Sequence, residues 1–288
     1  MKGGPALPQG RSRSRKLFIA VPGRNDRAFY KMFIKEAAYL QGLTYYDLDA
    51  VNRLSEKKAV LKEIAPSELV SRGVSIARLK SDQYSYFVDT VIWPMEGERG
   101  EPLKRVRLLL SYQLGLDKPT LDYLVVVRDI ENQNGDTVVQ GIVDGLSANH
   151  QCIKSSRSTH GRYFVYVQDV CGKGINLLAL AQGLEHLHCL PLSLERHALE
   201  DFVIYLSWDK LKEYLQGCSV LREIVRGRYA HKKLAALAAI DACRPSVDEA
   251  FFRRIINRSS VEKLCRIHDG LNALCNLLRF IPGLSSRI

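Results

Sequence analysis

The stretch that decides the fold reads Leu121-Asp122-Tyr123-Leu124-Val125-Val126-Val127-Arg128-Asp129-Ile130-Glu131-Asn132. The nearly continuous apolar run at 121–127 is typical of a strand that is buried on both faces of a parallel sheet. Two acidic residues, Asp129 and Glu131, follow it two positions apart. Alternate residues of an extended chain point to the same side. The pattern therefore predicts two carboxylates that leave one strand end together.

Strand and helix patterns alternate on both sides of this run. Strands are expected at 17–21, 86–93, 121–127 and 163–167, and helices at 26–40, 56–72, 102–116, 137–146 and 174–187. This alternation predicts an α/β domain over residues 16–190, with a mostly parallel sheet and flanking helices. After Pro191 only helical periodicity is found, at 194–215, 220–228, 231–242, 247–256 and 261–280. Residues 191–288 are therefore expected to form a smaller, all-helical domain.

The positive charge of the chain is unevenly distributed. The net charge is +11, yet residues 1–16 hold five basic and no acidic residues, and residues 211–288 hold 14 basic and 7 acidic residues. Residues 1–15 are rich in Gly, Pro, Ser and Arg, and we expect a disordered basic arm there. Clustered Lys and Arg gain affinity for polyanions by releasing phosphate counterions. The expected partner is a nucleic acid, DNA or RNA, although simple solubility would also explain the charge.

Composition and cysteine content limit the class of protein. With 46% hydrophobic and 25% charged residues, the chain has an ordinary globular composition, which argues against a disordered or collagen-like protein. Apolar runs stay well below the roughly 20 residues of a membrane-spanning helix, so no membrane partner is expected. Seven widely spaced cysteines favour a reduced, cytoplasmic protein. A protein partner or a homo-oligomer stays open.

A second strand end carries chemistry similar to the first. It reads Val21-Pro22-Gly23-Arg24-Asn25-Asp26. In an open parallel sheet, ligands collect beyond the carboxyl ends of the strands. Carboxylates fixed at such an edge suit Mg²⁺, or Mn²⁺, which takes one or two carboxylates together with waters or phosphate oxygens. The alternative is that Asp129 and Glu131 are two solvated acids in a loop.

These residues resemble the Toprim domain, which occurs in topoisomerases, bacterial-type primases and related nucleases. The Toprim pattern is an apolar strand that ends in Glu-Gly with Asp often three residues after the Gly, and a second strand that ends in Asp-x-Asp. Gly23 and Asp26 match the first motif, and Asp129 and Glu131 match the second as Asp-x-Glu. The resemblance spans about residues 16–190. It implies a Toprim- or Rossmann-like sheet and a metal-dependent site for phosphodiester chemistry on a nucleic acid.

The chain departs from that pattern at Pro22, which stands where Toprim proteins carry their Glu. Proline offers neither a proton nor a metal ligand. Asp26 and Glu200 are the candidates for the catalytic acid/base role, and the resemblance suggests Asp201 as a further metal ligand beside Asp129 and Glu131. The alternative for Glu200 and Asp201 is a solvent-facing pair on an amphipathic helix, since surface carboxylates greatly outnumber ligands.

The basic residues near these motifs are candidates for nucleic-acid binding. Arg24 and Arg128 lie beside the two strand ends, and Lys232 and Lys233 lie in a later helix. Two other motifs are weaker. The sequence His186-Leu187-His188-Cys189 lacks zinc-site spacing. The sequence Cys171-Gly172-Lys173-Gly174 lacks the spacing of a nucleotide-binding P-loop, although backbone N–H groups there could still meet a phosphate.

Three functions remain open at the level of the sequence. The leading hypothesis is a Toprim-like, Mg²⁺-dependent nuclease, a hydrolase that cleaves phosphodiester bonds. The second is a non-catalytic nucleic-acid-binding protein on a decayed Toprim scaffold, as a subunit of a larger complex, which explains Pro22 directly. The third is an α/β enzyme that acts on a small phosphorylated substrate. Fold alone does not choose among them.

Overall fold

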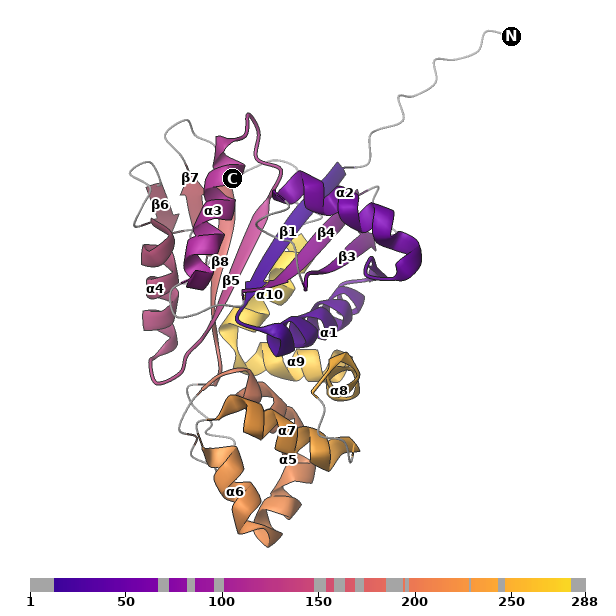
Figure 1. Ribbon diagram of the computed structural model, residues 1–288, viewed down its shortest axis with the longest axis vertical. Helices are drawn as coiled ribbons and strands as arrows, with labels where there is room; N and C mark the ends of the chain where they lie inside the picture. Colours follow the sequence, from indigo (N-terminus) through magenta and orange to yellow (C-terminus); the bar gives the residue numbers. More distant parts are fainter. Residues whose placement is uncertain are drawn as a thin grey trace, which may run out of the picture.

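A computed structural model describes residues 13–66, 73–81, 86–95, 101–147, 154–157, 164–168, 174–184, 194, 197–227, 229–242 and 247–280 (Figure 1). The strands are β1 (Arg13–Val21), β2 (Leu43–Asp47), β3 (Ser75–Ser81), β4 (Tyr86–Pro94), β5 (Tyr123–Asp129), β6 (Lys154–Arg157), β7 (Phe164–Gln168) and β8 (Gly174–Gln182). The helices are α1 (Arg24–Leu40), the short 3-10 helix η1 (Val51–Arg53), α2 (Leu54–Ile64), α3 (Glu101–Gly115), α4 (Gly135–Ser147), α5 (Leu199–Gly217), α6 (Ser219–Arg226), α7 (Ala230–Ala242), α8 (Glu249–Ile255), α9 (Arg258–Ile267) and α10 (Asp269–Phe280).

One eight-stranded sheet organises the molecule, in the order β2-β3-β4-β1-β5-β8-β7-β6. The four central strands, β4, β1, β5 and β8, are parallel, and the two strands at each edge pair antiparallel. The chain leaves β1 toward β4 on one side and later places β5 on the other. The order of the strands therefore reverses between β1 and β5, and such a switch point is where open α/β sheets bind ligands.

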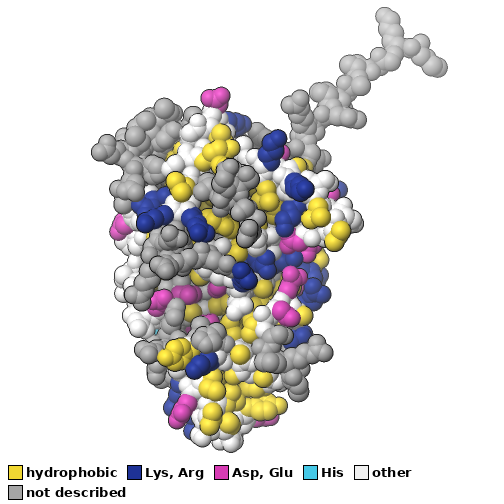
Figure 2. Space-filling view, in the orientation of Figure 1, with side chains coloured by type: hydrophobic (Ala, Val, Ile, Leu, Met, Phe, Trp, Pro, Cys, Tyr) yellow, Lys and Arg dark blue, Asp and Glu magenta, His cyan; other side chains and the backbone are white. Residues whose placement is uncertain are grey.

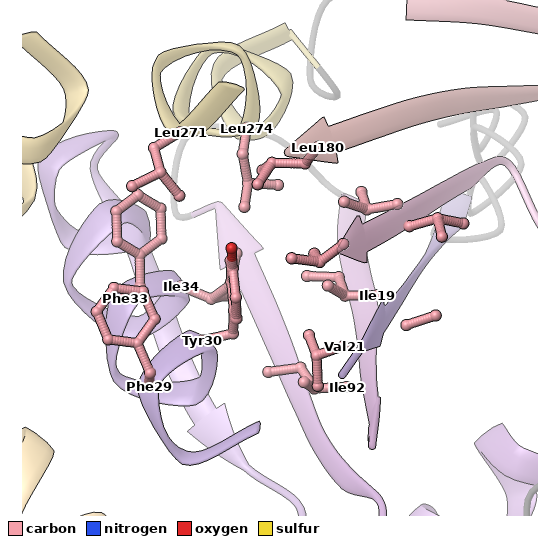
Figure 3. Packing of buried hydrophobic residues seen from close by; sticks show 14 of the residues in the cluster. Ile19, Val21, Phe29, Tyr30, Phe33, Ile34, Ile92, Leu180, Leu271 and Leu274 are labelled. Atoms are coloured by element: carbon pink, nitrogen blue, oxygen red, sulfur yellow. The ribbon is translucent and has the colours of Figure 1, made fainter. Parts of the chain in front are cut away.

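Helices cover both faces of this sheet. Helices α3 and α4 pack together, with α4 on β5 and β8, while α1 and α10 pack together, with α1 on β4 and α10 on β8. Figure 3 shows how aromatic side chains of α1 and leucines of α10 meet strand residues such as Ile19 and Leu180. Strands covered on both faces need apolar residues at every position, which explains the unbroken run in β5. The α/β class with a helical C-terminal region is confirmed.

The sequence-based elements differ from the structure in several places. The stretch 174–187 was expected to be helical, but residues Gly174–Gln182 form the central strand β8. Alternation is absent because α4 and α10 cover both faces of β8, and its Leu and Ala residues are also good helix formers. Strands β2 and β3 were not predicted. The expected helix at 261–280 is two helices, α9 and α10, which meet at His268.

The structure differs from the expected basic arm at 1–15 and from the expected single helical domain at 191–288. Strand β1 begins at Arg13, inside the expected arm, because it pairs with β4 from that residue and Arg15 forms a 2.6 Å ion pair with Asp122. The C-terminal helices split into two groups: α5, α6 and α7 pack together as a lobe, whereas α8, α9 and α10 pack on α1 (Figure 1). The boundary at residue 190 stays a prediction. No helix in the described ranges is long and apolar enough to cross a membrane.

Candidate functional site

The first site residue, Asp26, lies in the first turn of α1, directly after β1. Helix α1 begins without a side-chain cap, because Gly23 stands at its N-cap. The Asp26 carboxylate turns back over this glycine: a Cβ on Gly23 would lie 3.3 Å from Asp26 Oδ2. The backbone N–H groups of Gly23 and Asp26 donate to the same carboxylate. Asp26 thus accepts N–H groups that a helix leaves unpaired at its start, and its position is fixed by the helix.

Gln182 joins Asp26 to the second site residue, Asp129. Asp129 ends β5, and Gln182 is its register partner at the end of β8. The Gln182 side chain is fully buried, and its Nε2 donates to Asp26 Oδ1 at 2.6 Å and to Asp129 Oδ1 at 2.8 Å. One amide therefore holds two carboxylates that come from the ends of β1 and β5. This is the switch point of the sheet.

Glu200 supplies a third carboxylate from the first turn of α5. Its side chain is buried, and the segment before it is tied to the sheet by a backbone bridge between His197 and Glu131. Gly183 permits this close approach, since its φ is +132° and a Cβ there would lie 2.9 Å from the His197 carbonyl carbon. The start of α5 is therefore held against the ends of β5 and β8.

Three acidic groups of the site have raised pKa values. Burial, followed by the charge of Asp129, raises the pKa of Asp26 to about 7. Burial also raises the pKa of Glu200 to about 7, with further contributions from Asp26 and Asp201 and an opposing one from Lys233. Burial and the charges of Asp26 and Asp129 raise the pKa of the Tyr30 hydroxyl well above its ordinary value. These shifts indicate that Asp26 and Glu200 are poorly hydrated and lie close to other acids.

Three buried polar atoms near this space accept or donate no hydrogen bond within the described residues. They are Tyr30 Oη, Gln182 Oε1 and Asp201 Oδ1. Tyr30 lies on α1, and Figure 3 shows its hydroxyl oxygen pointing between the sheet and α10. Buried polar atoms without a partner are costly, and a native protein keeps them where a ligand, ion or water satisfies them. They make the space around Gln182 a candidate binding site.

The predicted site residues are only partly brought together. Asp26, Asp129 and Glu200 meet at the strand ends. Asp201 instead supports the backbone: its Oδ2 accepts from the Leu184 N–H at 2.9 Å and lies 2.9 Å from His197 Nδ1. Asp201 is fully buried, and the predicted solvent-facing alternative for the pair on α5 is wrong, because both carboxylates are buried.

Glu131 does not continue the alternation that was expected to place it beside Asp129. Strand β5 ends at Asp129, and Glu131 adopts a left-handed backbone with φ of 56°. Its side chain is exposed, whereas Asp129 is half-buried against Gln182. The left-handed conformation is uncommon for a residue with a side chain. The pleat therefore supplies one carboxylate at this strand end and not the expected pair.

The predicted nucleic-acid contacts fall into two groups. Arg24, Arg128 and Lys232 are exposed, the first two beside the strand ends and Lys232 over the Tyr229 ring at 4.7 Å. Lys233 is only 1% exposed, and its charge acts on Glu200. A lysine in the interior is out of reach of a nucleic acid on the surface. The motifs at 186–189 and 171–173 lie outside the described residues.

Sequence reasoning missed Gln182, Tyr30 and His197. Gln182 was overlooked because its strand was interpreted as a helix, and Tyr30 because it falls on the apolar face of α1. For Gln182 a signal existed: a polar residue, followed by Gly183, ends an apolar run, as Asp129 does in β5. No such signal distinguishes Tyr30 from the other aromatic residues of α1.

The donor set is suited to a hard divalent cation. Carboxylate and amide oxygens are the ligands that Mg²⁺ and Mn²⁺ prefer, and Mg²⁺ is commonly held by one or two carboxylates. Asp26 and Asp129 provide two, and rotation of the Gln182 amide would exchange Nε2 for the unpartnered Oε1. Among the described residues, no group of three or more His, Cys, Asp or Glu side chains is arranged to hold a metal ion. A two-carboxylate site is therefore what these residues fit.

Comparisons with known proteins extend to the fold alone. No protein-family model matches the chain, and no curated protein matches its sequence. The chain is similar to the crystal structure of a hypothetical protein, PH0156, from Pyrococcus horikoshii OT3, with a TM-score of 0.61 and 19% identity over 92% of this chain and 99% of that one. A glyoxalase family protein from Bacillus cereus aligns with a TM-score of 0.18 and 14% identity over 60% of this chain and 98% of that one, too weakly for any argument.

Proposed function

We propose that this chain is a Toprim-like, metal-dependent protein that cleaves phosphodiester bonds in a nucleic acid. The observation that carries the proposal is the bridge from Gln182 to Asp26 and Asp129 at the switch point of the sheet. Two carboxylates from different strand ends meet there, where open α/β sheets bind their ligands. Both residues belong to the motifs that carry the Toprim resemblance, together with Gly23 and Glu131.

Asp26 and Asp129 would hold Mg²⁺ or Mn²⁺. A cation bound there supplies Lewis-acid stabilisation of the negative charge on a phosphate. The chain's own residues would do the rest. The N-terminus of α5 starts at the site, and unpaired backbone N–H groups at a helix start favour phosphate oxygens. Buried Gln182 and Tyr30 would orient the carboxylates and keep bulk water out of the space behind them.

Glu200 is the proposed acid/base group. The Toprim pattern places a Glu before the glycine of the first strand, and Pro22 stands there in this chain. Glu200 reaches the same end of the sheet from α5, close enough to Asp26 for the charge of Asp26 to raise the pKa of Glu200. A buried carboxyl can hold a proton near neutral pH and pass it to a leaving oxygen. Glu200 is therefore proposed to replace the missing Glu in space, although it comes from a distant part of the sequence.

Basic residues suited to the substrate backbone lie outside this centre. Arg24 and Arg128 are exposed beside the strand ends. On the face shown in Figure 2, Lys and Arg side chains are more frequent over the upper and middle parts of the molecule than on the lower lobe of α5–α7. Exposed Lys and Arg contact phosphates without reading sequence.

A second candidate function is nucleic-acid binding without catalysis. Pro22 favours it, and so does the Gln182 amide, whose Nε2 already donates to both carboxylates. In that case Gln182 would replace the cation, and the acids would have a structural role. The two proposals differ in what happens when a single carboxylate is neutralised.

The test is a cleavage assay on plasmid, single-stranded DNA and structured RNA, with Mg²⁺, Mn²⁺ or EDTA. We expect cleavage that requires the metal and falls by about 100-fold or more in Asp129→Asn. Asp209→Asn is the matched control, since Asp209 is an exposed acid on α5, away from the strand ends. Equal cleavage by Asp129→Asn would contradict the catalytic proposal. No cleavage with any metal, together with salt-sensitive binding, would favour the second candidate.

A further inference from the structure

A pair of cysteines lies where α9 packs on α10, and neither cysteine belongs to the candidate acidic site. Cys265 stands near the end of α9 and Cys275 in the middle of α10, and the two helices pack side by side. Their Sγ atoms are 2.7 Å apart. That separation is below about 3.5 Å, the distance of ordinary van der Waals contact between carbon atoms, and approaches the length of a disulfide bond.

Metal binding does not explain the pair. An imidazole, that of His268, lies in the turn between the two helices. Its Nδ1 accepts from the Leu271 N–H at 3.0 Å, and its Nε2 lies 2.9 Å from the Ala181 carbonyl oxygen, to which it must donate. Both ring nitrogens are therefore occupied, and neither offers a lone pair to a metal. Two thiols alone are too few for a structural metal site.

We propose that Cys265 and Cys275 form a reversible intramolecular disulfide in the presence of a peroxide. Cys265 is partly exposed and Cys275 is buried, so the oxidant meets Cys265 first. The Cys265 thiolate attacks one oxygen of hydrogen peroxide, which gives a sulfenic acid and releases the other oxygen as water after protonation. The Cys275 sulfur then attacks the sulfenic sulfur, its proton leaves with the hydroxyl as a second water, and the disulfide forms. A dithiol reductant reverses the step by thiol–disulfide exchange.

The disulfide would close the turn that fastens α10 to the central sheet. The turn Ile267–Gly270 lies between the two cysteines in the sequence. In this turn His268 contacts the carbonyl of Ala181, the residue before Gln182. A Cβ on Gly270 would lie 3.0 Å from both the His268 ring and the Leu180 side chain, so the turn is packed tightly on β8. Oxidation would restrict this turn in the unfolded chain and thereby stabilise the folded one.

The experiment treats the full chain with hydrogen peroxide and maps disulfides by mass spectrometry of non-reduced peptides. We expect a linked peptide pair that contains Cys265 and Cys275, lost on treatment with dithiothreitol. We also expect a rise of about 5 °C in the thermal unfolding midpoint on oxidation. Cys218→Ser is the matched control, because Cys218 is an exposed cysteine on another helix boundary and its loss should leave both results unchanged.

Cys265→Ser should abolish the linked peptide and the rise in the midpoint. If Cys265→Ser shows the same rise as the wild type, another cysteine is responsible and the inference fails. It also fails if peroxide converts Cys265 to a sulfinic or sulfonic acid while Cys275 stays open to alkylation after unfolding. Neither outcome depends on whether the chain cleaves a nucleic acid, so the inference and the proposed function can fail separately.

Discussion

Two groups of charged side chains lie along the first half of α1, one around Asp26 and one around Lys31, and they differ in how their charges are compensated. The strand-end acid cluster comprises Asp26, Asp129, Glu200 and Asp201. The Lys31 cluster comprises Lys31, Lys57, Asp47, Asp49 and Glu249. In the Lys31 cluster, Lys31 Nζ contacts Asp47 at 2.8 Å, Asp49 at 3.1 Å and Glu249 at 3.2 Å. In the strand-end acid cluster, Asp26 and Asp129 both accept a hydrogen bond from the neutral amide of Gln182.

The pKa of Asp49 in the Lys31 cluster and the pKa of Asp26 in the strand-end acid cluster move in opposite directions. Burial alone would raise the pKa of Asp49, but the hydrogen bond from Lys57 and the charge of Lys31 outweigh it and lower that pKa. For Asp26, burial and the charge of Asp129 prevail and raise the pKa to about 7. Compensated charges hold elements together: Lys31 ties α1 to the end of β2 and to α8. A buried acid with a raised pKa, such as Asp26, is costly to the fold when it is charged, and such acids are typical of binding and catalytic sites.

The largest loss of stability is expected when the Lys31 cluster loses its buried cation. Lys31→Met keeps the aliphatic stem but leaves Asp47, Asp49 and Glu249 without the buried cation. We expect a loss of about 3 kcal/mol in the free energy of unfolding, measured by urea denaturation at pH 7. Lys58→Met, an exposed lysine on α2, serves as the control and should change stability by less than about 0.5 kcal/mol. A similar loss in both variants would mean that the Lys31 contacts contribute little.

The opposite change, neutralising an acid in the strand-end acid cluster, should stabilise the protein at high pH. The folded-state pKa of Asp26, about 7, lies above its ordinary value of 3.8, so the folded chain holds this proton more tightly. That contribution to stability is complete below pH 4 and is lost as the pH rises to about 7. Asp26→Asn should therefore exceed the wild type by about 2 kcal/mol at pH 8 without divalent metal, with little difference near pH 4.

Urea denaturation at pH 4.5 and pH 8 measures this difference, and Asp209→Asn should parallel the wild type at both values. If Asp26→Asn destabilises the protein equally at the two pH values, Asp26 is a structural hydrogen-bond acceptor and the contrast between the clusters is lost.

A smaller effect concerns Glu131, which the sequence had placed with Asp129. Its left-handed backbone favours glycine, so Glu131→Gly should raise the free energy of unfolding by about 0.5 kcal/mol. Glu131→Gln keeps the backbone cost and removes the charge. If Glu131→Gln lowers metal-dependent cleavage as strongly as Asp129→Asn, the Glu131 carboxylate belongs to the site in spite of its exposure.

Local sequence patterns were sufficient to predict the strand that ends in Asp129 and the turn that precedes Asp26. The run before Asp129 predicted a buried parallel strand, and the break at Pro22-Gly23 predicted the turn into α1. Periodicity could not separate β8 from a helix, because a strand buried on both faces has no polar side. Gln182, the residue that joins the two strand ends, was lost with that strand. The roles of Asp201 and Lys233 depend on how α5 and α7 pack on the sheet, which no local pattern encodes.

The central claim is that the strand-end acid cluster binds a divalent cation. Its most direct test is to measure the thermal or urea stability of the metal-free protein at pH 8 as Mg²⁺ is added. If Asp26 and Asp129 bind Mg²⁺, the protein should gain about 1.4 kcal/mol of stability when the cation is at ten times its Kd. Asp129→Asn should gain far less, and Asp209→Asn should gain as much as the wild type. An equal gain in Asp129→Asn, or no gain in the wild type with Mg²⁺ or Mn²⁺, would contradict the claim that the strand-end acid cluster is a cation site.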